Sequence, residues 1–159
     1  MTVIVVLLLL VASAAVAATV VVRTNKRKFA EANVVVPGTA TRAPAEWAGG
    51  HTPEARLHRR LRDAVAALRA NPALEDVFAM DARVSLEQQA LAVDERLVAV
   101  AALPEAVRAQ PLATVSEAVE AVEAAVAKLV AGPTERSGLD QAMVEVAERV
   151  SRLQQGDTV

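Results

Sequence analysis

Two histidines and a glutamate stand close together in a chain that has no cysteine, and side chains of these types could bind a metal. Glu54 and His58 are one helical turn apart, and His51 precedes them. A zinc site needs three or four ligands, commonly with two histidines four residues apart on a helix, and that spacing is absent. We therefore expect no metal and no cofactor here. His58 is predicted to be a solvated member of an arginine-rich helix face, with Trp47 as an apolar lid over the helix start.

Signatures of catalysis or nucleic-acid binding are missing from the sequence. It contains no phosphate-binding loop, nucleophile elbow or dinucleotide fingerprint. The formal net charge is −2 and aromatic residues make up 2% of the chain, so there is little surface on which bases could stack. The sequence therefore predicts neither an enzyme nor a nucleic-acid-binding protein, and it offers no catalytic residue.

Residues 3–22 form an uncharged and mainly apolar run. A helix of that length is about 30 Å long, which matches the hydrocarbon thickness of a bilayer. Residues 1–22 are therefore predicted to be a transmembrane anchor, followed by a basic juxtamembrane segment at 23–28. Basic residues on the C-terminal side of a span tend to stay in the cytoplasm, so the sequence predicts a single-pass plasma-membrane protein whose C-terminal domain is cytoplasmic. The residues that set this orientation are Arg23, Lys26, Arg27 and Lys28. Small residues at 12–17 leave open a cleaved signal peptide.

Residues 29–51 contain prolines and glycines without a helical period and are predicted to be a flexible linker. A helix then begins at Thr52, a good N-cap, with Pro53 in its first turn, and it ends near Asn71. Clustered arginines on this helix could contact anionic lipid; they are Arg56, Arg59, Arg60 and Arg62. The alternative is that they are solvated or pair with the second half of the chain, which is acidic.

The second half of the chain follows a helical period. Residues 72–103 contain no glycine and no proline after Pro72, so they form either one long helix or two with a break near 80–85. Thr114 and Glu117 have capping-box spacing and predict a helix start. In two successive segments apolar residues recur at alternating intervals of four and three residues, and this predicts an antiparallel helical hairpin. The facing residues, called the seam, are predicted to be bundle core or an interaction surface: Val115, Val119, Val122, Val126, Leu129, Leu139, Met143, Val146, Val150 and Leu153.

These patterns together predict an all-α protein. It comprises a transmembrane helix, a flexible linker, a small cytoplasmic helical bundle at 52–155 that ends in a coiled-coil-like hairpin, and a tail at 156–159. The favoured function is a membrane-anchored scaffold or protein-interaction module, with the membrane and either a second copy or another helical protein as partners. Two alternatives stay open: a membrane-surface sensor that binds anionic lipid through its basic helix, and a helical protein exported after signal cleavage.

Overall fold

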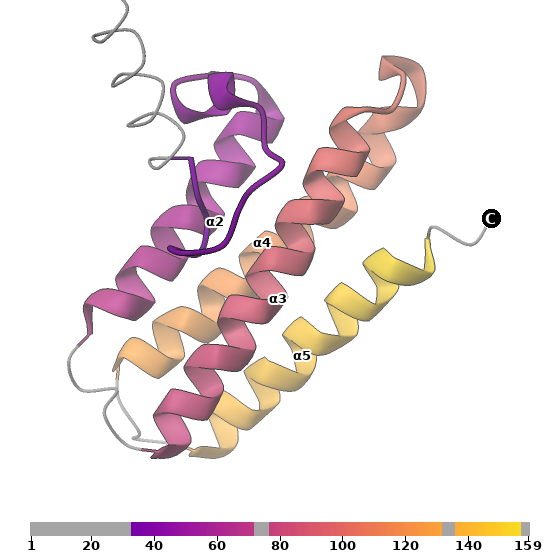
Figure 1. Cartoon of the computed structure of the whole chain (residues 1–159). Helices are drawn as coiled ribbons and strands as arrows, with labels where there is room; N and C mark the ends of the chain where they lie inside the picture. Colours follow the sequence, from indigo (N-terminus) through magenta and orange to yellow (C-terminus); the bar gives the residue numbers. More distant parts are fainter. Residues whose placement is uncertain (1–32, 72–76, 132–135, 157–159) are drawn as a thin grey trace, which may run out of the picture. The chain divides into compact units, whose positions relative to one another are not determined.

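The computed structural model describes residues 33–71, 77–131 and 136–156, which belong to one compact unit that begins at Asn33. These residues contain no strand, which confirms the predicted all-helical class for this part of the chain. Their helices, shown in Figure 1, are the 3-10 helix η1 (Ala45–Ala48) and the α-helices α2 (Pro53–Ala70), α3 (Val77–Ala101), α4 (Glu105–Ala131) and α5 (Arg136–Gln155).

Helices α3 and α4 form the centre of a four-helix bundle. Helices α2 and α5 each pack against both of them, and α2 and α5 do not contact each other in the described residues. Consecutive α-helices run in opposite directions (Figure 1). The start of α2, the end of α3 and the start of α4 therefore lie at one end of the bundle, which we call the α3–α4 turn end.

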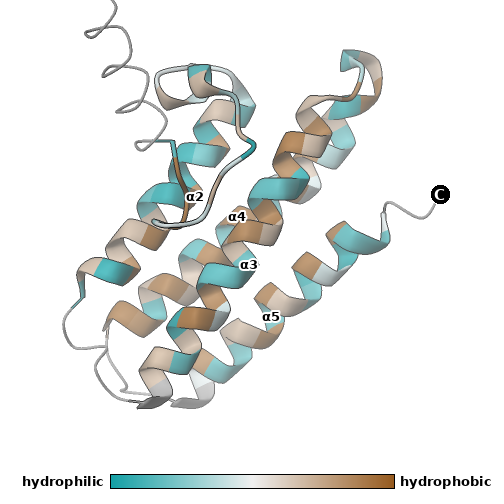
Figure 2. Ribbon diagram, in the orientation of Figure 1, coloured by the Kyte–Doolittle hydropathy of each residue, from teal (hydrophilic) through white to brown (hydrophobic). Residues whose placement is uncertain are grey.

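The core is built from leucine, valine and alanine on the facing sides of the four helices (Figure 2). Nine of the ten seam residues are buried in it, and Met143 packs against the same core. The hairpin of α4 and α5 is therefore present as predicted, and its seam is interior rather than free surface. Any surface of this unit that binds a partner must lie elsewhere.

Helix α2 begins and ends where the sequence predicts. Thr52 is the N-cap residue, and its hydroxyl accepts a hydrogen bond from the Ala55 amide at 3.2 Å. Pro53 is in the first turn and Asn71 is the C-cap residue. These are local signals, because each acts on backbone groups within one turn of itself.

Substituting the cap is expected to weaken the bundle. Thr52→Ala removes the acceptor for the Ala55 amide and should lower the free energy of unfolding by about 1 kcal/mol. Chemical denaturation of residues 33–159 would measure this loss. Thr114→Ala is the matched control, since Thr114 lies inside α4 and its hydroxyl bonds only to the carbonyl of Gln110. Equal losses for the two variants would contradict the cap assignment.

The structure decides between the two alternatives for α3 and corrects the expected start of α4. Helix α3 runs unbroken from Val77, so no break occurs at 80–85. Helix α4 begins at Glu105, nine residues before Thr114, and it contains Pro111. A proline removes one backbone hydrogen bond, here to the carbonyl of Val107, which lies in an exposed stretch where water can replace the donor. The capping-box spacing at Thr114 was therefore a wrong start signal.

Residues 33–51 also differ from the predicted flexible linker, because they pack on the bundle. Val35, Val36 and Trp47 are buried in the core cluster. Gly50 allows a close approach, since a Cβ there would lie 2.9 Å from the Glu46 carbonyl oxygen. These apolar side chains therefore belong to the same core as those of the four α-helices.

The predicted span at 3–22, the basic segment at 23–28 and the first part of the linker, 29–32, lie outside the described residues. Among the helices that are described, none combines the length and apolar character needed to cross a bilayer.

Candidate functional site

A buried polar cluster joins the segment at 33–44 to helices α2 and α3. His58, in the second turn of α2, is fully buried rather than solvated as the sequence suggested. Its Nδ1 lies 2.6 Å from Oδ1 of Asp94 on α3, and its Nε2 lies 3.0 Å from the carbonyl oxygen of Asn33. The second carboxylate oxygen of Asp94 accepts a hydrogen bond from the Thr41 hydroxyl at 3.1 Å. We call these four residues, Asn33, Thr41, His58 and Asp94, the His58 clasp.

The partners of His58 determine how its ring is protonated. The carbonyl of Asn33 can only accept, so Nε2 of His58 carries a proton and donates it. A second proton lies between Nδ1 and the carboxyl of Asp94. The pair is therefore neutral as a whole, whichever of the two holds that second proton. A neutral and fully hydrogen-bonded pair is far less costly to bury than an isolated charge.

The His58–Asp94 contact resembles that of a catalytic His–Asp pair, but both ring nitrogens of His58 already have partners within the protein. In such pairs the carboxylate orients the ring, and the other ring nitrogen exchanges protons with a nucleophile or substrate. Here that nitrogen is taken by the Asn33 carbonyl. The buried Trp47 ring also packs beside the His58 ring, with ring centroids 5.6 Å apart. The arrangement therefore fastens the segment at 33–44 to the bundle.

The residues considered as metal ligands take separate roles. His58 belongs to the clasp, whereas the buried carboxylate of Glu54 pairs with Arg108 at the start of α4, at 3.3 Å. His51 is exposed in the turn before α2. Within the part of the chain that the structure describes, histidines and carboxylates do not gather in a group of three that could hold a metal ion.

The arginines predicted as a lipid-binding face are largely engaged within the unit. Arg59 donates to the backbone carbonyls of Trp47 and Gly50. Arg60 forms two hydrogen bonds to Glu123 on α4, at 2.9 and 2.6 Å, and these raise the pKa of its guanidinium. Arg62 pairs with its neighbour Asp63. Arg56 is exposed and has no carboxylate partner in the described residues, so it is the arginine of the set that is placed to bind another molecule.

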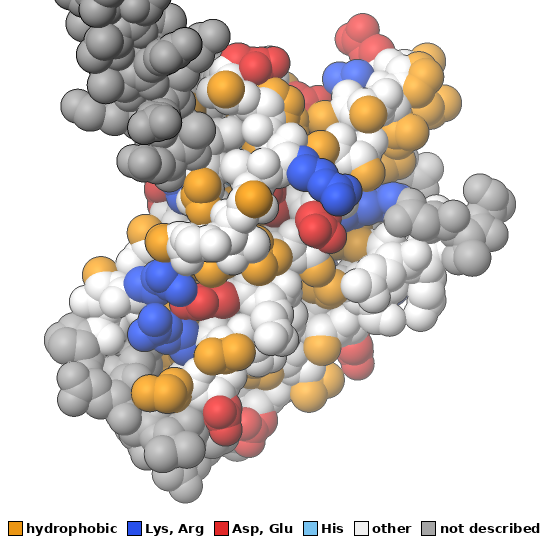
Figure 3. Space-filling view, in the orientation of Figure 1, with side chains coloured by type: hydrophobic (Ala, Val, Ile, Leu, Met, Phe, Trp, Pro, Cys, Tyr) orange, Lys and Arg blue, Asp and Glu red, His pale blue; other side chains and the backbone are white. Residues whose placement is uncertain are grey.

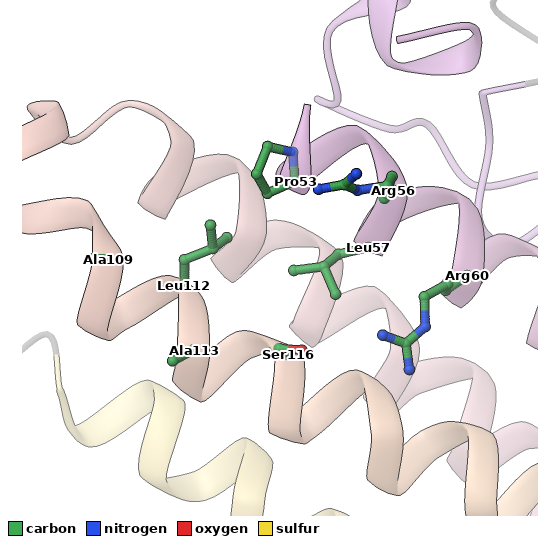
Figure 4. A pocket seen from close by; sticks show the side chains of 8 residues that line it. All are labelled: Pro53, Arg56, Leu57, Arg60, Ala109, Leu112, Ala113 and Ser116. Atoms are coloured by element: carbon green, nitrogen blue, oxygen red, sulfur yellow. The ribbon is translucent and has the colours of Figure 1, made fainter. Parts of the chain in front are cut away.

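Arg56 stands at the rim of an open groove between α2 and α4 (Figure 4). The groove has a volume of about 400 Å³. Leu57 and Leu112 point into it from the two helices, and Arg56 and Arg60 line its α2 side (Figure 4). The complete lining is Pro53, Arg56, Leu57, Arg60, Ala109, Leu112, Ala113 and Ser116. An apolar floor beside a guanidinium suits a ligand that has both an apolar and an acidic part.

A second ion-pair cluster is formed where α2 passes α3. Glu87 accepts hydrogen bonds from Arg69, at 2.7 and 3.0 Å, and from Arg83, at 3.2 Å. The bonds from Arg69, and secondarily the bond from Arg83, lower the pKa of the Glu87 carboxyl. A carboxyl with a lowered folded-state pKa stabilises the fold above the pKa of the unfolded chain, about 4.3, and this contribution is lost as the pH falls through the folded-state value.

Glu87→Gln is therefore expected to destabilise the unit at neutral pH only. The loss should be about 1 kcal/mol or less, because the arginines are partly exposed. Urea denaturation at pH 7 and at about pH 3 would measure it, and the difference from the unsubstituted protein should shrink at the acid pH. A deficit that stays constant over this range would contradict the ion-pair origin.

Sequence reasoning missed Asn33, Thr41 and Asp94, although one signal pointed to Asp94. It follows Val93 and precedes Leu97 on the buried side of α3, where a carboxylate is seldom found without a partner. His58 similarly falls three residues before Leu61 in the buried stripe of α2. Each is a polar residue at an apolar position, and neither position shows by itself which residue is the partner.

The described part of the chain is thus a four-helix bundle whose N-terminal segment is fastened by a buried histidine–aspartate pair. Comparison with models of protein families, with curated proteins and with solved structures finds no match to the chain. A bundle architecture serves many unrelated functions, so the fold by itself does not define the function of this molecule.

Proposed function

We propose that this chain is a single-pass membrane-anchored interaction module, and that the groove between α2 and α4 binds an acidic amphipathic segment of a partner protein. The observation that carries the proposal is the pairing of an apolar groove floor with Arg56, whose guanidinium has no carboxylate partner in the described residues. The anchor is the apolar run at 3–22, and the basic residues after it favour a cytoplasmic body.

The chemistry of the groove defines the partner. Apolar side chains of the partner would cover Leu57 and Leu112, and its carboxylate would form a bidentate pair with Arg56. Helical segments present such side chains at intervals of three and four residues, which suits a groove between two helices. The seam of α4 and α5 is occupied by core packing, so it does not compete for this role.

Photo-crosslinking in intact cells tests this function. A photoreactive amino acid in place of Ala113, which lines the groove, should capture a partner whose crosslinked peptide is acidic and amphipathic. The same amino acid in place of Ser151, exposed on α5, is the control and should not capture it.

Charge reversal at the rim should then weaken the complex. Arg56→Glu is expected to lower the affinity for the captured partner about tenfold or more, since a hydrogen bond to a charged group contributes about 1.5–3 kcal/mol. Arg152→Glu, on the exposed side of α5, is the matched control. The function is contradicted if Ala113 and Ser151 give the same crosslinks or if both reversals act alike.

A further inference from the structure

An apolar surface lies on the turn between α3 and α4, at the α3–α4 turn end of the bundle. Val107, in the first turn of α4, is 58% exposed, although valine is a residue type that is usually buried. Figure 3 shows hydrophobic side chains gathered there, at the upper right of the view. The residues of this surface, which we call the apolar tip, are Ala102, Leu103, Pro104, Ala106 and Val107.

The backbone of the tip is held by the protein itself. The Leu103 amide donates to the Val100 carbonyl at 3.0 Å. The Leu103 carbonyl accepts from Nε and Nη2 of Arg108, at 3.1 and 2.6 Å. Arg108 also pairs with Glu54, which directs its charge toward α2. The turn therefore needs less water for its polar groups than an open loop would, and this lowers the cost of contact with an apolar phase.

The His58 clasp fixes where the chain reaches the bundle. It holds Asn33 against the second turn of α2, and Asp94 lies about 10 Å before the end of α3. Both positions are near the end of the bundle that carries the apolar tip. The predicted span ends at Val22, so only residues 23–32 separate it from Asn33. These residues reach at most about 36 Å when fully extended.

We propose that the apolar tip is a membrane-contact surface that rests on the lipid bilayer at headgroup depth. This inference depends on the anchor in the proposed function. Helix α4 is about 40 Å long, so turning the opposite end toward the bilayer would require residues 23–32 to run extended along nearly the whole bundle. Exposed Glu105 sits beside the tip, so the contact is apolar and shallow rather than an attraction to anionic lipid.

Two single-cysteine variants test the inference, because the chain has no cysteine of its own. Val107→Cys places a label on the tip, and Val144→Cys places it on α5, where the native valine is equally exposed, 57% against 58%. The full chain is reconstituted in phosphatidylcholine vesicles and labelled with an environment-sensitive fluorophore. The label at position 107 should emit further to the blue and be quenched several-fold more strongly by brominated lipid than the label at position 144.

The possible failures are distinguishable. Alkaline carbonate extraction first establishes whether the chain is integrated in the vesicles. If it is washed off, the anchor is wrong and the membrane contact falls with it. If it is integrated and both labels remain in water, the anchor holds and the contact is overturned. Strong quenching of both labels would show the bundle lying on its side and would overturn the end-on contact as well.

Discussion

Val126→Asp is expected to remove most of the helical signal of residues 33–159. Val126 lies in α4, is 4% exposed, and belongs to the core cluster that joins α4 to its neighbours. An unpaired buried carboxylate costs several kcal/mol, and a domain of this size has only about 5–15 kcal/mol of stability in total. Circular dichroism during thermal unfolding would show a collapsed transition or none.

Val144→Asp is the matched control, since it makes the same chemical change at a valine that is 57% exposed on α5. It should leave the helical signal intact and shift the thermal midpoint little. If Val126→Asp stays folded and instead changes the oligomeric state, the seam is an interface between copies and not the core of one chain. If it changes neither folding nor assembly, the packing of α4 against α5 is wrong.

Asp94→Ala is expected to release the segment at 33–48 and to destabilise the unit by about 1–3 kcal/mol, because it leaves the buried Nδ1 of His58 without a hydrogen-bond partner. The Thr41 hydroxyl loses its acceptor in the same variant. Trp47 is the only tryptophan and packs beside His58, so its fluorescence reports on this segment directly. The emission should move to the red in Asp94→Ala before global unfolding.

Asp81→Ala provides the control, since Asp81 is an exposed carboxylate on the same helix. The double variant His58→Leu with Asp94→Leu should recover part of the lost stability, because it removes the unpaired ring nitrogen of His58. The recovery should be incomplete, since the Asn33 carbonyl and the Thr41 hydroxyl lose their partners in this variant. Unchanged Trp47 emission in Asp94→Ala would show that the segment is held by Val35, Val36 and Trp47 alone. The clasp would then have no structural role.

Local signals in the sequence were sufficient for a large part of the fold. The start of α2 at Thr52 and Pro53, its end at Asn71 and the heptad spacing of the α4–α5 hairpin were all correctly predicted. Each rests on contacts within a helical turn or on a periodicity that marks one face of a helix. The groove was only partly predictable: the arginines of α2 were identified, but the sequence did not show which of them would be left without a partner.

The remainder was decided by tertiary structure. Thr114 and Glu117 have the spacing of a helix start, yet α4 begins at Glu105 and continues through Pro111. The contacts of this first part come from Arg108, which bonds to the Leu103 carbonyl and pairs with Glu54 on α2. In the sequence His58 looks like one more polar residue of a basic helix. In the structure Asp94, 36 residues away, and the Asn33 carbonyl form its hydrogen bonds. Residues 33–51 resemble a linker in the sequence because the residues that hold them, His58 on α2 and Asp94 on α3, are also distant along the chain.

The sequence by itself therefore determined the helices and their apolar faces, because those depend on neighbours along the chain. Which polar groups are buried, which arginines stay free and where the N-terminal segment is fastened depended on partners distant in sequence, and only folding brings these together.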